Sequence, residues 1–140
     1  MGCFNTTVVK APRAEVWKLL RNFHDLSWAS GVIESLEVVG DASADQIGAK
    51  RILNGVFHET LLALDDVDHT FQYQITDGPG PVSKEKVQGY IGQVRVFPVT
   101  ADDTTYVEWT SRWGSSAGGV ADFCNPIYRA LLQALEAHFG

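Results

Sequence analysis

Between residues 33 and 113, apolar and polar side chains alternate with a period of two, which is typical of β-strands that bury one face. The alternation predicts strands at about 33–39, 49–53, 57–64, 71–75, 86–97 and 104–113, and a β-branched run predicts an earlier strand at 4–9. Asn54-Gly55 predicts a tight hairpin turn, because both residue types tolerate a positive φ. Two prolines and two glycines predict an irregular loop at 77–81.

Two segments follow a helical period instead. Apolar residues recur at helical spacing from 16 to 23, and we expect this helix to break near Asn22, with a second turn running to Trp28. The segment 117–139 also has helical periodicity, interrupted only by Pro126. We expect this proline to kink the helix or to mark where its regular part begins.

The order of these elements predicts the fold class. One strand, two short helices, six strands and one long helix indicate an α+β fold, in which the helices cover one face of an antiparallel meander. The chain has 140 residues, so we expect one domain spanning 1–140.

A curved sheet of this kind predicts an internal cavity. An antiparallel sheet of six or seven strands curls strongly, and one helix covers only the middle of its concave face. The large side chains expected on that face are Phe57, Phe71, Tyr73, Tyr90, Trp109 and Trp113. Glu59 and Arg51 are expected on the same face. A core without water would not contain an unpaired charge, so these two residues favour a pocket. Apolar walls with a few converging polar groups are typical of a site for a small molecule.

Composition narrows the range of partners. The chain carries 17 acidic and 11 basic residues, a net charge of −6, and no run of Lys or Arg, so we expect no nucleic-acid partner. Its apolar stretches are too short to span a bilayer, and we expect a cytoplasmic protein without a secretory leader. The segment 1–6 fits an N-myristoylation signal, but no basic patch supports it, so we expect no stable membrane anchor.

The residues that commonly hold metals or act as nucleophiles are scattered. Cys3 and Cys124 lack C-x-x-C spacing and are expected to be free thiols, and the four histidines lack metal-ligand spacing. We therefore expect neither a metal nor an organic cofactor. Residues 114–118 fit the G-x-S-x-G pattern, but the 22 residues that follow leave no room for the acid and histidine of a hydrolase.

Several stretches together support a family resemblance. They are Ala11 to Trp17, Phe23 with Trp28, Gly48 to Arg51, Glu59 to Asp65, Tyr73 to Ile75, Val107 to Trp109 and the closing helix. In this order they resemble the START-like SRPBCC superfamily, in particular its polyketide cyclase/dehydrase and lipid-transport branch, over nearly the whole chain. The resemblance implies a helix-grip fold like that of the birch-pollen allergen: a six- to seven-stranded curved sheet around a long C-terminal helix, with two short helices after the first strand.

Arg51 and Glu59 also resemble a pair in plant lachrymatory-factor-synthase-like proteins and in the abscisic-acid receptors. That resemblance implies that both residues lie at the cavity, and Tyr90 matches a cavity tyrosine of the receptors. The receptors' Ser-Gly-Leu-Pro gate is replaced here by residues 54–56, and their His-Arg-Leu latch is absent. We therefore do not expect hormone reception through such a gate.

These considerations give a candidate site and two roles for its charged residues. The catalytic candidates are Glu59, Arg51 and Tyr90, and the ligand-binding candidates are Phe57, Leu61, Phe71, Tyr73, Trp109, Trp28, Cys124 and Tyr128. In the functional interpretation, Glu59 moves a proton and Arg51 stabilises the developing oxyanion. The alternative is a cross-strand ion pair that sets the register of the sheet, with the aromatic residues simply filling the core.

The resulting expectation is a monomer or weak homodimer that binds a hydrophobic small molecule. The resemblance implies cyclase- or dehydratase-like proton transfer on a carbonyl substrate. The alternatives are a non-catalytic carrier or sensor of lipids or small molecules, and an assembly helper whose own aromatic rings fill the pocket. We expect the segment 77–83 to border the entrance.

Overall fold

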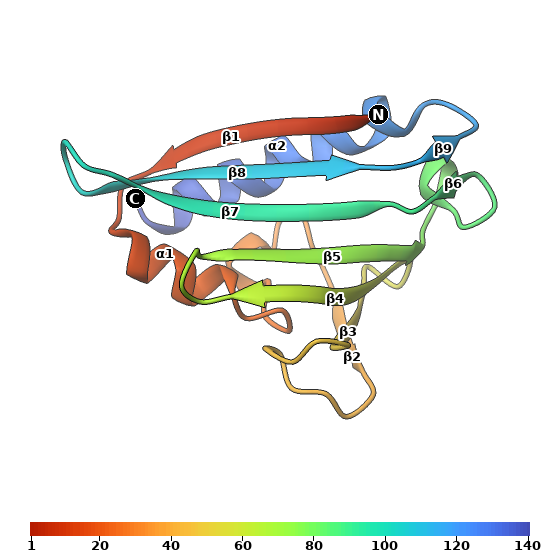
Figure 1. The fold of residues 1–140 in the computed structure, drawn as a ribbon, viewed down its shortest axis with the longest axis horizontal. Coiled ribbons are helices and arrows are strands. Elements are labelled where there is room, and N and C mark those ends of the chain that lie inside the picture. Colours follow the sequence, from red (N-terminus) through yellow and green to blue (C-terminus); the bar gives the residue numbers. More distant parts are fainter.

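The computed structural model describes residues 1–140 and has a seven-stranded antiparallel sheet, in the order β1-β8-β7-β5-β4-β3-β2 (Figure 1). The strands are β1 (Gly2–Val9), β2 (Leu36–Val39), β3 (Lys50–Leu53), β4 (Phe57–Asp65), β5 (Thr70–Asp77), β6 (Val87–Gln88), β7 (Ile91–Val99), β8 (Thr104–Arg112) and β9 (Ser115–Ser116). The helices are α1 (Arg13–Leu20), η1 (Ser27–Ala29), η2 (Gly80–Val82) and α2 (Val120–His138). The predicted α+β, helix-grip architecture is confirmed.

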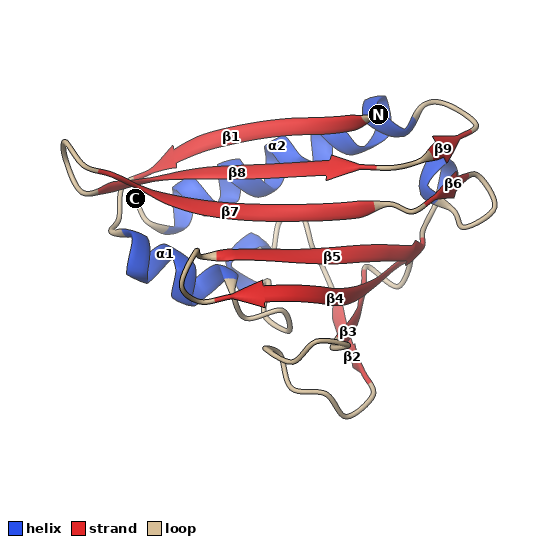
Figure 2. Cartoon of the chain, in the orientation of Figure 1, coloured by secondary structure: helices blue, strands red, loops and turns tan.

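The long helix α2 lies behind the sheet and crosses obliquely behind β1 and β8 (Figures 1 and 2). Two side-chain hydrogen bonds join β1 to this helix: Asn5 donates to Asn125 at 2.8 Å, and the hydroxyl of Thr7 donates to Glu136. Because β1 pairs with β8 over its whole length, the N-terminal strand is fixed on two sides by elements from the C-terminal part of the chain.

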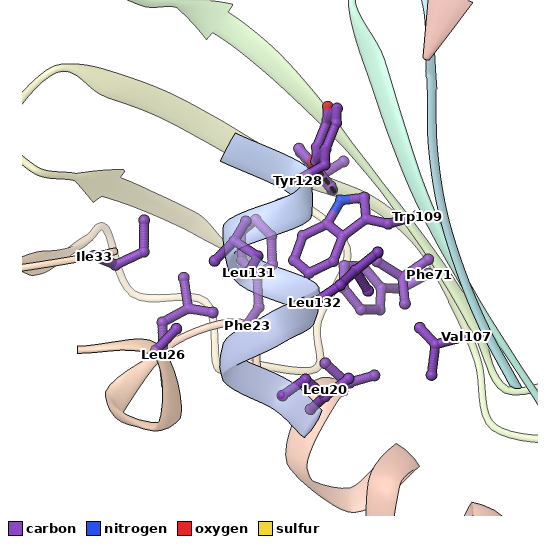
Figure 3. Packing of buried hydrophobic residues seen from close by; sticks show 14 of the residues in the cluster. Leu20, Phe23, Leu26, Ile33, Phe71, Val107, Trp109, Tyr128, Leu131 and Leu132 are labelled. Carbon is purple, nitrogen blue, oxygen red and sulfur yellow. Dashed lines mark hydrogen bonds between the residues drawn. The ribbon is translucent and has the colours of Figure 1, made fainter. Parts of the chain in front are cut away.

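The helical periodicity of 117–139 places one face of α2 in the core. Its buried residues are Val120, Cys124, Tyr128, Leu131, Leu132 and Leu135, which follow the three- and four-residue spacing of one helix face. Figure 3 shows this face between Leu26 and Ile33 on one flank and Phe71, Val107 and Trp109 from the sheet on the other. The buried face of the helix therefore packs on the sheet with one flank and on the segment around η1 with the other.

Several predicted boundaries are wrong. The strand expected at 33–39 begins only at Leu36, and the helix expected from 117 begins at Val120, after a short strand, β9, that the pattern did not indicate. The strand expected at 86–97 is divided into β6 and β7, because Gly89 has φ 64°, which an extended strand does not allow. Pro126 lies inside α2, six residues after its start, and does not mark the beginning of the helix.

Local turn chemistry was predicted more accurately. Asn54 and Gly55 have φ values of 54° and 70°, so the β3–β4 hairpin turns through two positive-φ residues as expected. The hairpin places Arg51 of β3 directly opposite Glu59 of β4. Two register shifts in β4, one of them directly before Glu59, bend this strand and orient its side chains.

Candidate functional site

A cavity lies between the concave face of the sheet and the middle of α2. Twelve of its fourteen lining residues are hydrophobic, and the two charged ones are Arg51 and Glu59. The cavity has a volume of about 40 Å³, and the wider hollow, including its open mouth, encloses about 460 Å³. The concave face is therefore incompletely filled, with free space on the scale of a few water molecules.

Arg51 and Glu59 form a buried ion pair in this wall. The Nε and Nη2 atoms of Arg51 donate to Oε1 of Glu59 at 2.9 and 2.7 Å, and Nη1 donates to the carbonyl oxygen of Phe23 at 3.0 Å. The guanidinium also lies over the ring of Phe23, with its carbon 3.9 Å from the ring centre. The side chains are only 4% and 6% exposed. These contacts fix Arg51 and hold Glu59 against it.

Both donors from Arg51 converge on one carboxylate oxygen of Glu59, and the other, Oε2, accepts no hydrogen bond from the protein. Burial raises the pKa of Glu59 above its ordinary value of 4.5, and the neighbouring Arg51 offsets part of that rise. A carboxyl group with a raised pKa and one free oxygen at an apolar cavity is suited to accepting and returning a proton.

Besides the ion pair, the cavity wall contains a cluster of three tyrosine hydroxyls, those of Tyr73, Tyr90 and Tyr128. Tyr90 and Tyr128 are hydrogen-bonded to each other, and the indole Nε1 of Trp109 donates to the hydroxyl of Tyr73 at 3.0 Å. The ring of Tyr90 stacks on Trp113 at a centroid distance of 5.5 Å, which fixes its orientation. Burial raises the pKa of all three phenols, so they remain neutral donors at physiological pH.

Cys124 is the thiol in the cavity wall. Both cysteines are free, as predicted, and both are buried. Burial raises the pKa of Cys124 to about 11, so the group is a protonated thiol at neutral pH and a poor nucleophile.

The structure brings most of the predicted site residues to one place. The cavity is lined by Arg51, Glu59, Tyr90, Phe57, Tyr73, Trp109, Cys124 and Tyr128. Leu61, Phe71 and Trp28 are buried in the core but do not line the cavity. Phe71 packs against Trp17 and Phe23, on the side of the core where α1 lies.

Sequence reasoning missed six apolar wall residues: Leu26, Ile33, Leu53, Ile75, Ile127 and Leu131. Leu53 and Ile75 continue the inward alternation of Arg51 and Tyr73, so the period of two contains the signal for both. Leu26 and Ile33 flank η1 in irregular segments, where no periodicity could have indicated their direction.

The expected entrance loop does not reach the cavity. No residue of 77–83 lines it, and this segment instead forms η2, whose Val82 is buried. Val82 occupies the space beside Gly78, where an added Cβ would lie 2.8 Å from its side chain. The segment is anchored by this packing rather than standing free at the mouth.

The structure contains no group of three or more His, Cys, Asp or Glu side chains arranged to hold a metal ion. None of its helices combines the length and the apolar character that a bilayer crossing requires.

Comparison with solved structures supports the fold. A protein from Nitrosospira multiformis is 41% identical, with a TM-score of 0.97 over 100% of this chain and 97% of that one. XoxI from Bacillus cereus is 20% identical, with a TM-score of 0.80 over 99% and 94% of the two chains. Major latex-like protein 151 from Panax ginseng is 14% identical, with a TM-score of 0.73 over 99% and 97%.

No curated protein matches the sequence. The sequence profile of one family, described as polyketide cyclase / dehydrase and lipid transport, matches residues 1–140. The match covers the sheet, the helix and every residue of the cavity. The chain belongs to this polyketide cyclase/dehydrase and lipid-transport family of the SRPBCC superfamily.

Proposed function

We propose that the chain binds a hydrophobic small molecule in the cavity and that Glu59 transfers a proton on a carbonyl group of that ligand. The observation that supports this most strongly is the free Oε2 of a buried carboxylate whose other oxygen is held by Arg51. The largely apolar wall favours a hydrophobic guest, and the family description includes both cyclase/dehydrase enzymes and lipid transport.

The proposed step begins with Glu59 ionised. Its carboxylate takes a proton from the carbon next to the carbonyl, and the electron pair of that C–H bond moves to the carbonyl oxygen, which gives an enolate. Return of a proton to carbon restores the carbonyl compound and the carboxylate. In this proposal Arg51 positions Glu59 through their ion pair, and Tyr90 or Tyr73 orients the substrate.

A second candidate function is a carrier or sensor without catalysis. It is favoured by the closed ion pair, because Arg51 already uses three of its five N–H groups within the protein. In this case the pair anchors the polar end of the guest and no bond is broken.

Acetophenone separates these functions, because it is a small apolar ketone with exchangeable methyl protons. Its binding requires the side chains of the wall to move apart, since the cavity as it stands holds only a few water molecules. In D2O, the wild-type chain should bind acetophenone and accelerate incorporation of deuterium into its methyl group, measured by mass spectrometry. Glu59→Gln should still bind it but lose the acceleration, because an amide cannot accept the proton. Glu37→Gln, at an exposed position of β2, is the matched control.

Binding without accelerated exchange in the wild-type chain would support the carrier function. Failure of the wild-type chain to bind acetophenone, together with the absence of any co-purified small molecule in native mass spectrometry, would contradict ligand binding itself.

A further inference from the structure

The cavity contains more hydrogen-bond donors than its charged pair suggests. Tyr73 comes from β5, Tyr90 from the segment between β6 and β7, and Tyr128 from α2, so three separate parts of the chain bring phenol groups to one wall. Tyr128 lies beside Trp109, with 5.9 Å between the ring centres (Figure 3).

Counting protons shows that the cluster keeps a donor for a guest. An indole N–H only donates, so the oxygen of Tyr73 accepts from Trp109 and its own proton remains available. The bond between Tyr90 and Tyr128 uses one proton of the two that these phenols carry. Tyr73 therefore keeps its proton for a guest, and Tyr128 keeps its own where Tyr90 is the donor in the bond between them.

Arg51, by contrast, is largely committed. Its charge is balanced by Glu59, and three of its N–H groups are bound to Glu59 and to the carbonyl of Phe23. The ring of Phe23 also covers one face of the guanidinium. The donors left for a guest's oxygen are therefore chiefly the phenols.

The charges of the wall determine what kind of oxygen these donors can hold. Arg51 and Glu59 cancel, and the phenols are neutral, so the cavity has no uncompensated positive charge. A guest carboxylate would lose its hydration and lie near the negative Glu59, which is costly without a free cation. A ketone or aldehyde oxygen needs only a neutral donor.

We infer that Tyr128, together with Tyr73, holds the carbonyl oxygen of the ligand, so that the cavity selects a neutral carbonyl compound over a carboxylate of the same shape. This inference rests on the proposed function and adds to it the residue that binds oxygen and the charge of the ligand. Tyr128 thereby binds the ligand's oxygen, a role that the sequence analysis gave to Arg51.

Three probes of one shape test the inference: acetophenone, benzoate and ethylbenzene. The ¹⁵N-labelled chain is titrated with each at pH 7, and binding is followed by the indole N–H signal of Trp109, which is hydrogen-bonded to Tyr73. Acetophenone should shift this signal and bind at least about tenfold more tightly than benzoate, a free-energy difference of about 1.4 kcal/mol. This comparison uses the unaltered chain, so it does not depend on whether a variant folds.

Two tyrosine variants identify the residue that donates a hydrogen bond to the carbonyl oxygen of the ligand. Tyr128→Phe should weaken acetophenone binding about three- to tenfold, the usual effect of one neutral hydrogen bond, and leave ethylbenzene binding unchanged. Tyr106→Phe is the matched control, because Tyr106 lies on the outer side of the sheet, away from the cavity, and its hydroxyl donates to Glu108.

Benzoate binding as tightly as acetophenone, or equal losses for acetophenone and ethylbenzene in Tyr128→Phe, would overturn the inference and leave ligand binding standing. If none of the three probes shifted the Trp109 signal and no small molecule co-purified with the chain, the proposed function would fail and the inference with it.

Discussion

The two halves of the interior differ in how they are filled. At the end of the sheet near α1, Val96, Val107 and Leu135 have no exposed surface, and the buried hydroxyl of Thr105 is satisfied by the carbonyl of Ala11 at 2.6 Å. Around the N-terminal half of α2, the same sheet instead surrounds an ion pair, three phenols and unfilled space. One end is a tightly packed hydrophobic core, and the other encloses a cavity.

The comparison shows where stability and function reside in this fold. Tight apolar packing contributes free energy through burial and dispersion, whereas buried charges contribute little net stability and are tolerated only as a matched pair. We therefore expect substitutions in the filled half to change stability alone, and substitutions in the cavity half to change both stability and the properties of the guest site.

The largest effect is expected from removing one member of the buried ion pair. Arg51→Met leaves Glu59 charged and unpaired in an apolar wall and should lower the free energy of unfolding by about 3–5 kcal/mol in urea denaturation at pH 7. The matched control is Arg95→Met on the outer face, where Arg95 lies 3.8 Å from Glu108 and is 48% exposed, with an expected loss of about 1 kcal/mol or less.

Adding Glu59→Met to Arg51→Met should restore most of the loss, because no charge then remains buried. Similar costs for Arg51→Met and Arg95→Met would show that the inner pair is not desolvated, and the contrast between the two halves would then disappear.

A pair of leucines one turn apart on α2 compares the two halves directly. Leu135→Ala, in the filled half, should cost about 2–5 kcal/mol of unfolding free energy, because its neighbours cannot close the void. Leu131→Ala should cost less, since Leu131 already borders free space, and it should strengthen the binding of guests larger than acetophenone. Thermal unfolding and guest titration measure the two effects, and equal guest affinities in both variants would contradict the division.

Gly92 offers a test of how the phenol cluster is positioned. A Cβ at this residue would clash with Cζ of Tyr73, so the ring of Tyr73 fits only because Gly92 has no side chain. Gly92→Ala should displace the ring, cost about 1–3 kcal/mol of unfolding free energy, and move the indole N–H signal of Trp109. At Gly31 an added Cβ meets nothing within 4 Å, so Gly31→Ala should leave both measurements unchanged.

The last comparison concerns the pH dependence of stability. Since the folded-state pKa of Glu59 is raised above 4.5, the folded chain binds this proton more tightly than the unfolded chain. The stability linked to protonated Glu59 is complete below pH 4.5 and is lost as the pH rises through the folded-state pKa. From pH 7.5 down to 4.5, wild type should therefore gain stability relative to Glu59→Gln, by at most about 1.4 kcal/mol per pH unit. Parallel curves would mean that the pKa of Glu59 is not raised.

The sequence was most informative where one physical rule determined the outcome. The period of two predicted the inward direction of Arg51, Glu59 and Tyr73, and Asn54-Gly55 predicted the turn that places the first two opposite each other. Sequence periodicity could not reveal the hydrogen bond between Tyr90 and Tyr128, because it depends on how the sheet curls toward α2. The position of the segment 77–83 was also beyond reach, since η2 is held by tertiary packing of Val82.

The attachment of β1 has a consequence for how the chain reaches its folded state. Residues 2–9 pair with residues 105–112, and Asn5 and Thr7 bond to α2 still later in the sequence. One long edge of the sheet therefore cannot form until about a hundred residues of intervening chain have been brought together, which carries a large loop-closure entropy. We expect folding limited by this late joining of the two ends, with β1 unpaired and open to wrong strand partners until it occurs.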